Sequence, residues 1–143
     1  MSKIALVTGG SRGLGRNTAV SIARHDGDVI LTYRTNKEQA KAVVAEIEAL
    51  GRKAVALLLD TGTVATFPAF VEALRASLTQ TFGRDTLDYL VNNAGHGEMA
   101  EFAAATEAQF DQLFNVHVKG VFFLTQALLP VLADGGRIIN FSS

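Results

Sequence analysis

A glycine-rich segment near the start of the chain is the part best suited to chemistry. Residues 8–15 read Thr-Gly-Gly-Ser-Arg-Gly-Leu-Gly and follow the apolar run Lys3–Val7 directly. Glycines let a backbone turn tightly and approach a pyrophosphate with no Cβ in the way, and a following helix offers free N–H groups and the positive end of its dipole. A plain tight turn is the alternative. The position between an expected strand and an expected helix favours a dinucleotide-binding loop.

The end of the second apolar run indicates which dinucleotide fits. Residues 31–35 read Leu-Thr-Tyr-Arg-Thr and contain no acid. A carboxylate here would bind the ribose 2′-hydroxyl of NAD and repel a 2′-phosphate, whereas a guanidinium can bind that phosphate through two parallel hydrogen bonds. Arg34 therefore predicts NADP(H) over NAD(H) by at least about tenfold, or ~1.4 kcal/mol. Arg12, in the glycine-rich segment, is a second arginine. Two solvated surface charges are the alternative reading.

Alternating strands and helices must position these residues. Apolar runs and helical periodicity predict strands at Lys3–Val7, Val29–Tyr33, Ala54–Leu59, Leu87–Val91 and Arg137–Phe141. The helices between them are expected at Leu14–His25, from a capping box Thr35–Glu38 to Gly51, from Phe67 to about Gly83, and from a capping box Thr106–Gln109 to about Leu132. This order predicts an α/β fold, a Rossmann-type doubly wound parallel sheet with its ligand at the carboxyl ends of the strands.

Composition excludes several other classes of function. The 143 residues are 48% hydrophobic, carry a net charge of −1 and include no cysteine, so we expect one domain over residues 1–143 without disulfides or thiolate chemistry. The three histidines lack metal-ligand spacing, and no basic face suggests a nucleic acid. The longest apolar stretch, Gly120–Ala133, is shorter than the ~20 residues of a membrane helix. A cytoplasmic protein is the expectation.

Four motifs in order resemble the short-chain dehydrogenase/reductase family, and in particular its ketoacyl-carrier-protein reductases and its sugar or polyol dehydrogenases. The glycine spacing Gly9-xxx-Gly13-x-Gly15 matches the family's first turn. The other three are Asn92-Asn93-Ala94-Gly95, Asn115 within Asn-Val-His-Val-Lys-Gly, and residues 136–143, Gly-Arg-Ile-Ile-Asn-Phe-Ser-Ser. The resemblance implies the N-terminal, NADP-binding part of such an enzyme, with the Rossmann-type sheet incomplete at its C-terminal end.

The resemblance also assigns roles to residues around the expected ligand. Asp60 would contact the adenine ring, although a turn-forming Asp at the end of a strand is an equal alternative. Asn93, Ala94 and Gly95 would line the cofactor's ribose, unless they form only a strand-to-loop turn. The full set expected to bind the cofactor is Gly9, Ser11, Arg12, Gly13, Leu14, Gly15, Tyr33, Arg34, Asp60, Asn93, Ala94 and Gly95.

For catalysis, the resemblance points to Asn115 and Ser143. Asn115 would kink its helix and hold a water for proton relay, and Ser143 would hydrogen-bond the substrate oxygen. The family's catalytic Tyr-x-x-x-Lys would follow the fifth strand, beyond Ser143, so we expect residues 1–143 alone not to reduce carbonyl compounds. A string of that form, Tyr33 to Lys37, crosses from a strand into a capping box, whereas the family's pair shares one face of a helix.

The expected function is interconversion of a ketone or aldehyde and an alcohol by hydride transfer, with a small-molecule substrate whose identity the sequence leaves open. A non-catalytic nucleotide-binding module, or an inactive fragment of such an enzyme, is the alternative; Asn115 and Ser143 favour the enzyme.

The long helix at residues 107–132 is apolar on more than one face, which predicts a homo-oligomer. His117 is expected to be an ordinary interior or interface residue, and His96 a solvated loop residue.

Overall fold

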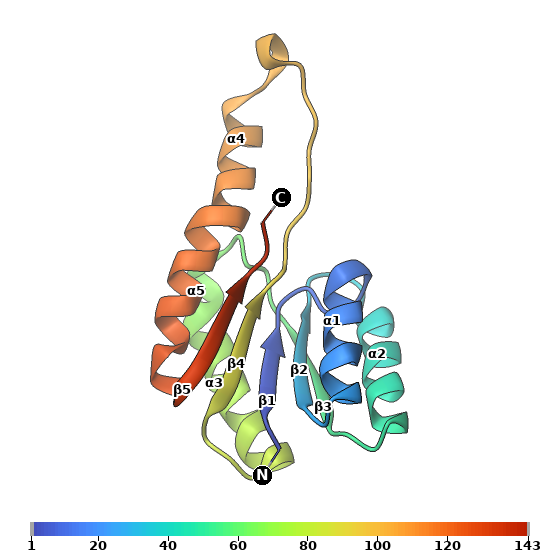
Figure 1. The fold of residues 1–143 in the computed structure, drawn as a ribbon. Coiled ribbons are helices and arrows are strands. Elements are labelled where there is room, and N and C mark those ends of the chain that lie inside the picture. The colour runs from blue at the N-terminus through green and yellow to red at the C-terminus, as the bar shows by residue number, and fades with distance from the viewer. Residues whose placement is uncertain (1, 143) are drawn as a thin grey trace.

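The computed structural model describes residues 2–142, which form one parallel sheet with helices on both faces (Figure 1). The sheet has the strand order β3-β2-β1-β4-β5, and every neighbouring pair is parallel. The strands are β1 Ile4–Val7, β2 Asp28–Tyr33, β3 Ala54–Leu58, β4 Leu87–Asn92 and β5 Leu132–Asn140. The predicted doubly wound sheet is confirmed, and the order of strands reverses between β1 and β4, where such sheets bind ligands.

Helices cover both faces of the sheet, with α1 and α2 on one and α3 and α5 on the other (Figure 1). The regular helices are α1 Gly13–Arg24, α2 Lys37–Ala49, α3 Phe67–Ser77, α4 Glu107–Phe114 and α5 Gly120–Leu128. Two π-helical turns, η2 Leu78–Phe82 and η4 Asn115–Lys119, extend α3 and join α4 to α5. Three short 3₁₀ turns complete the chain: η1 Val64–Thr66, η3 Phe102–Ala104 and η5 Leu129–Val131.

Each face of the sheet supports its own apolar core. Successive residues of a strand point to opposite faces, so Leu6 joins the core beneath α3 and α5, whereas Val7 joins the core beneath α1 and α2. In α2, Ala40, Val43 and Ile47 lie on one stripe of the helix and are buried in the second core. Fully burying a Val or Ile side chain contributes roughly 1.5–3 kcal/mol. The two cores hold the carboxyl ends of β1 to β4 at a common edge.

One of the two predicted capping boxes is confirmed and the other is wrong. The Thr106 side chain accepts a hydrogen bond from the Gln109 backbone at 3.1 Å, and the Gln109 side chain accepts one from the Thr106 N–H at 2.9 Å. In α2, however, the N-cap is Asn36, whose side chain accepts from the Gln39 N–H at 3.0 Å. Asn is an N-cap at least as good as Thr, so a one-residue shift keeps the helix start satisfied.

The last strand is longer than predicted. β5 begins at Leu132, opposite Leu87, rather than at Arg137, and the pairing has an irregularity between Leu87 and Tyr89. Gly135 takes a φ of +77°, which accommodates the extra residues. The residues Asp134-Gly135-Gly136 have the composition of a turn, and they lie in this irregularity, between Leu132, which pairs with Leu87, and Arg137, which pairs with Tyr89.

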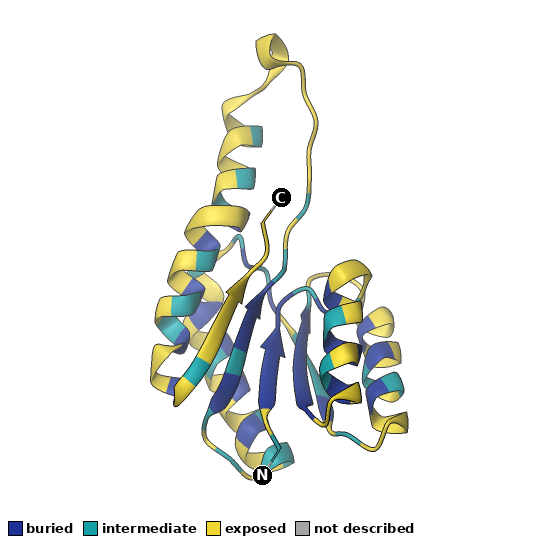
Figure 2. Cartoon of the chain, in the orientation of Figure 1, coloured by how far each residue is buried: buried dark blue, intermediate teal, exposed yellow. Residues whose placement is uncertain are grey.

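The long helical segment runs past the sheet. Nothing in α4 is buried, and the helix extends beyond the carboxyl edge of the strands (Figures 1 and 2). Residues Glu107–Val131 are, by length and composition alone, long and apolar enough to cross a membrane. The sequence predicts no such segment, because its longest apolar stretch, Gly120–Ala133, is shorter than a membrane helix. Core helices of globular proteins meet the same criterion, and Leu124 and Leu128 of α5 are fully buried in the core.

Asp88 joins β4 to β1 at the amino edge of the sheet. Its carboxylate accepts hydrogen bonds from the Ile4 N–H at 2.9 Å and from Arg84 Nη1 at 2.8 Å, and it lies 3.8 Å from Lys3 Nζ. Burial by itself raises the pKa of Asp88, but the hydrogen bonds from Arg84 and Ile4 and the charges of Arg84 and Lys3 outweigh it, so the pKa is lowered from its ordinary value.

This carboxylate should make folding dependent on acid pH. Because its pKa is lowered in the folded protein, its contribution is complete above about pH 4 and is lost as the pH falls through the folded value. We expect Asp88→Asn to reduce the free energy of unfolding at pH 7 by about 2 kcal/mol and to flatten the acid side of the profile. Urea unfolding between pH 3 and 7 measures both, with the exposed Asp85→Asn as control. Equal profiles for wild type and Asp88→Asn would contradict this account.

Candidate functional site

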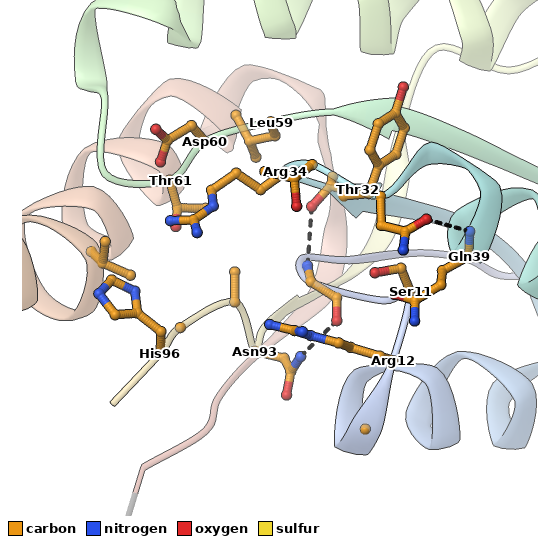
Figure 3. A pocket seen from close by; sticks show the side chains of 18 of the residues that line it. Ser11, Arg12, Thr32, Arg34, Gln39, Leu59, Asp60, Thr61, Asn93 and His96 are labelled. Carbon is orange, nitrogen blue, oxygen red and sulfur yellow. Dashed lines mark hydrogen bonds between the residues drawn. The ribbon is translucent and has the colours of Figure 1, made fainter. Parts of the chain in front are cut away.

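A pocket of about 440 Å³ lies at the carboxyl ends of β1 to β4. Every residue predicted to bind the cofactor lines it except Gly15. It is also lined by residues with no predicted role in cofactor binding: Thr32, Thr35, Asn36, Gln39, Leu59, Thr61, His96 and Val116. Figure 3 shows side chains from the ends of these strands and from the glycine-rich turn around one space. The structure thus gathers the predicted residues at one place.

The glycine-rich turn is held by the end of β2. The Gly9 N–H donates to the Thr32 hydroxyl at 3.1 Å, and the Gly10 N–H donates to the Thr32 carbonyl at 3.0 Å. Gly9 has a φ of +66° and Gly13 a φ of +57°, which is the left-handed region that favours glycine. Thr32 is therefore a positioning residue that sequence reasoning missed. The sign of this role in the sequence was a polar residue near the end of an otherwise apolar strand.

Gly15 does not line the pocket; it lies in α1, where it packs directly against the glycine-rich turn. A Cβ at this position would lie 2.1 Å from the Gly9 carbonyl oxygen and 2.4 Å from Asn93 Nδ2. Helix α1 can approach the turn so closely only because Gly15 has no side chain. Gly15 therefore sets the position of the helix that faces the pocket.

The Asn93 side chain locks the same turn to the end of β4. Its Nδ2 donates to the carbonyl oxygens of Thr8 and Gly9, both at 3.1 Å. The backbone N–H groups of Asn93 and Ala94 donate to the Thr8 hydroxyl, each at 3.0 Å. Thr8 and Asn93 thus tie two strand ends together. Asn93 is more than a strand-to-loop turn residue, and Thr8 is a second buried hydroxyl whose role the sequence did not indicate.

The start of α1 presents unpaired backbone groups to the pocket. Its N-cap, Arg12, has an extended backbone and makes no side-chain capping bond, and the first turn carries no acid. The first N–H groups of a helix have no partner within the helix, and its dipole places a partial positive charge at this end. Because Gly13 and Leu14 line the pocket, this end is suited to an anion.

Two arginines add full positive charge from opposite sides. In Figure 3, Arg34 extends from the end of β2 toward Thr61, and Arg12 lies along the glycine turn near Asn93. Both are exposed, and within residues 2–142 neither takes part in an ion pair. Arg16, one turn into α1, is instead paired with Glu46 at 2.6 Å. The two pocket arginines therefore remain available to an anionic ligand.

Asp60 lines the pocket and also forms its own turn. One carboxylate oxygen accepts from the Gly62 N–H at 2.9 Å, and the other accepts from the Thr63 hydroxyl at 3.0 Å. Each oxygen can accept a second hydrogen bond, so a ligand contact is still open. The turn alternative is thus observed, and contact with an adenine ring stays a prediction.

Of the two residues predicted for catalysis, only Asn115 falls within residues 2–142, and it lies apart from the pocket lining. Asn115 is half-buried where α4 passes into the π-helical turn η4, and it does not line the pocket. Next to this turn, Gly120 packs so tightly that a Cβ would lie 1.8 Å from the Thr61 carbonyl oxygen. Ser143 lies outside the described residues. Tyr33 ends β2 and Lys37 begins α2, so they do not share a helix face.

His96 does not behave as the expected solvated loop residue. It lines the pocket, and its Nε2 is buried with no hydrogen-bond partner among residues 2–142. The His117 ring lies against the backbone of Gly95 and His96. These contacts depend on how η4 packs against the loop after β4, which cannot be predicted from the neighbouring sequence alone.

The geometry agrees with comparisons to known proteins. The family model described as short chain dehydrogenase matches residues 3–143. The chain is 41% identical to an uncharacterised oxidoreductase of Methylorubrum extorquens over 141 residues, 99% of this chain and 54% of the relative. It spans about half the length of such curated relatives.

Solved structures give the same result. A short chain dehydrogenase from Burkholderia cenocepacia in complex with NADP is 40% identical, with a TM-score of 0.88 over 99% of this chain and 55% of that one. The angucycline C-6 ketoreductase LanV with bound NADP is 38% identical, with a TM-score of 0.94 over 99% of this chain and 55% of that one. The chain belongs to the short-chain dehydrogenase/reductase family.

Proposed function

We propose that this chain is the NADP(H)-binding part of an oxidoreductase that interconverts a ketone or aldehyde and an alcohol. The observation that carries the proposal is the pocket at the strand ends, where an uncapped helix start and two arginines outside any observed ion pair face one space. The two NADP-bound relatives, a short chain dehydrogenase and a ketoreductase, support it.

The pocket residues fit the separate parts of such a cofactor. The N–H groups at the start of α1 would bind the pyrophosphate, which approaches the glycine turn without meeting a side chain. Arg34 and Arg12 would hold the 2′-phosphate, because no carboxylate stands at the end of β2 to repel it. The tight contact of Gly15 with Gly9 keeps the turn in the required shape. When bound, the nicotinamide ring supplies or accepts the hydride.

Two further residues would act on the substrate side. We propose that Asn115 holds a water for proton transfer near the junction of α4 and η4, and that Ser143 hydrogen-bonds the substrate oxygen as negative charge develops there. Both assignments come from the family's motifs. The substrate is a small carbonyl compound or alcohol.

The test is turnover by the full-length protein. With NADPH and a panel of ketones and aldehydes, we expect absorbance at 340 nm to fall and an alcohol to form. NADPH binding without turnover of any carbonyl compound or alcohol would favour the nucleotide-binding module over the enzyme. No binding at all would contradict both.

The long helix predicts assembly of the full-length protein. Phe110, Phe114 and Phe122 are 66%, 48% and 63% exposed, and Val118 is 52% exposed. Apolar side chains at this density on one helix mark a contact surface. We expect a homo-oligomer, at least a dimer, by light scattering at micromolar concentration.

Negative charge introduced among these exposed apolar side chains of α4 and α5 should dissociate the oligomer. Each copy of a symmetric interface would bury two like charges, so Phe110→Glu/Phe122→Glu should run as a monomer with an unchanged circular dichroism spectrum. Leu50→Glu, at the exposed end of α2, is the matched control and should leave the mass unchanged. A monomeric wild type would count decisively against this prediction.

A further inference from the structure

His96 carries an unsatisfied polar atom at the pocket wall. Its Nε2 has no hydrogen-bond partner among residues 2–142 and is out of reach of solvent. Leaving a buried nitrogen unpaired costs free energy, so such atoms normally have a partner in the working molecule. His96 lines the 440 Å³ pocket, and its ring can turn about the Cα–Cβ and Cβ–Cγ bonds toward a molecule that enters there. A bound ligand is therefore the candidate partner.

His117 fixes the backbone from which this side chain projects. Its Nε2 lies 2.7 Å from the His96 carbonyl oxygen and 3.3 Å from the His96 backbone nitrogen. The shorter contact is a hydrogen bond in which the ring N–H donates to the carbonyl. The two rings are 6.1 Å apart. A Cβ on Gly95 would lie 2.3 Å from the His117 ring, so only glycine allows this contact.

The same π-helical turn brings a second loop to His96. Val116, next to His117, packs against Gly62, where an added Cβ would lie 3.0 Å from the valine side chain. η4 thus joins the turn after β3 to the loop after β4. The slot between them is lined by two apolar side chains, Leu59 and Val116, and three polar ones, Asp60, Thr61 and His96. Figure 3 shows His96 on the side of Asp60 and Thr61, away from Ser11 and Gln39.

A flat heteroaromatic base matches this slot. Apolar walls suit the faces of such a ring, and polar groups suit its edge. The slot lies between the turn after β3 and the loop after β4, and Figure 3 shows the Arg34 side chain directed toward Thr61 at this slot, whereas the glycine turn lies at the end of β1. If a dinucleotide binds with its pyrophosphate at the glycine turn and its 2′-phosphate at Arg34, its adenine ring is expected in this slot. Adenine carries both donors and acceptors at its edge, so either neutral form of the imidazole finds a partner.

We propose that His96 is a cofactor-binding residue whose ring nitrogen hydrogen-bonds the adenine ring of the dinucleotide, held in place by His117. The inference rests on the proposed function, because it assumes that a dinucleotide binds the pocket. It adds a contact that sets the affinity for the adenosine half and leaves the nicotinamide half unaffected.

The test compares two ligands in titrations of the full-length protein. NADPH contains both halves of the cofactor, and 2′,5′-ADP contains the adenosine half only. We expect His96→Leu to weaken both ligands by the same factor, about three- to tenfold, the effect of one neutral hydrogen bond. His96→Asn is shorter and should show the same loss, so it replaces His96→Leu if that variant fails to fold. His25→Leu, whose ring at the end of α1 contacts Ser21, is the matched control with unchanged affinities.

The outcomes separate this inference from the function on which it rests. Wild-type protein that binds neither ligand contradicts the proposed function itself. Wild-type protein that binds both, with His96 variants that bind them as tightly, overturns the role of His96. A loss for NADPH with none for 2′,5′-ADP places the contact on the nicotinamide side and overturns the assignment to adenine.

Discussion

The Gly15→Ala variant of the full-length protein should lose at least about a hundredfold in NADPH affinity, ~2.7 kcal/mol. The new methyl group would lie 2.1 Å from the Gly9 carbonyl oxygen and 2.4 Å from the Asn93 side chain. The Gly9 carbonyl can yield only by moving backbone that is hydrogen-bonded to Thr32, and the Asn93 side chain only by giving up its hydrogen bonds to Thr8 and Gly9. Helix α1 must therefore shift away from the turn, and the N–H groups that face the pyrophosphate shift with it.

A matched control separates this clash from the general cost of alanine at glycine. Gly97 lies in an open loop, where an added Cβ meets nothing within 4 Å, and Gly97→Ala should bind NADPH like the wild type. Isothermal titration measures the affinities, and thermal unfolding checks that each variant is folded. If folded Gly15→Ala binds NADPH within a few-fold of wild type, the turn is not the cofactor site.

The second large effect concerns cofactor choice. Arg34→Asp should reverse the preference, lowering NADPH affinity by about ten- to a hundredfold while NADH affinity changes little or improves. The substitution removes charge-assisted hydrogen bonds to the 2′-phosphate, worth roughly 1.5–3 kcal/mol, and puts a carboxylate in their place. In NAD-dependent relatives of this fold a carboxylate at this place binds the 2′-hydroxyl.

Lys37→Asp is the control for charge alone. It makes the same change of charge three residues further on, at the first residue of α2, but Lys37 does not line the pocket. We expect it to keep the wild-type ratio of affinities apart from a small, salt-dependent change. A preference that Arg34→Asp leaves untouched would show that this arginine is only a solvated surface charge.

Sequence periodicity predicted those parts of the fold in which the local preference for a strand, helix or turn agrees with the overall arrangement. The strands are short apolar runs ended by turn residues, and the glycine-rich segment falls between a strand and a helix, so its place at the pocket followed from the βαβ order alone. The helix predicted from Phe67 to about Gly83 is formed by α3 and η2 and ends at Phe82, just before Gly83, which takes a φ of +64°. Such features are determined within a few residues and so are visible in one sequence.

The parts that were missed depend on partners far along the chain. Thr8 and Thr32 look like ordinary strand residues, and their roles become visible only when the ends of β1, β2 and β4 meet. The early start of β5 depends on pairing with Leu87, more than forty residues away. His96 resembles a solvated loop residue until η4 brings His117 against it.

Asp60 shows the limit of assigning one role to one residue. As a turn residue it holds Gly62 and Thr63, and as a pocket residue it faces the slot beside His96. The sequence allowed both interpretations, and both are compatible with the structure. The cytoplasmic location, the oligomer, and the catalytic roles of Asn115 and Ser143 stay predictions.

The most direct test of the central claim is a titration of the wild-type, full-length protein with NADPH and with NADH under one set of conditions. The pocket, with its uncapped helix start and two arginines outside any observed ion pair, predicts saturable binding of one NADPH per chain, at least about tenfold tighter than NADH. No saturable binding of either nucleotide, or NADH binding as tight as NADPH, would contradict it.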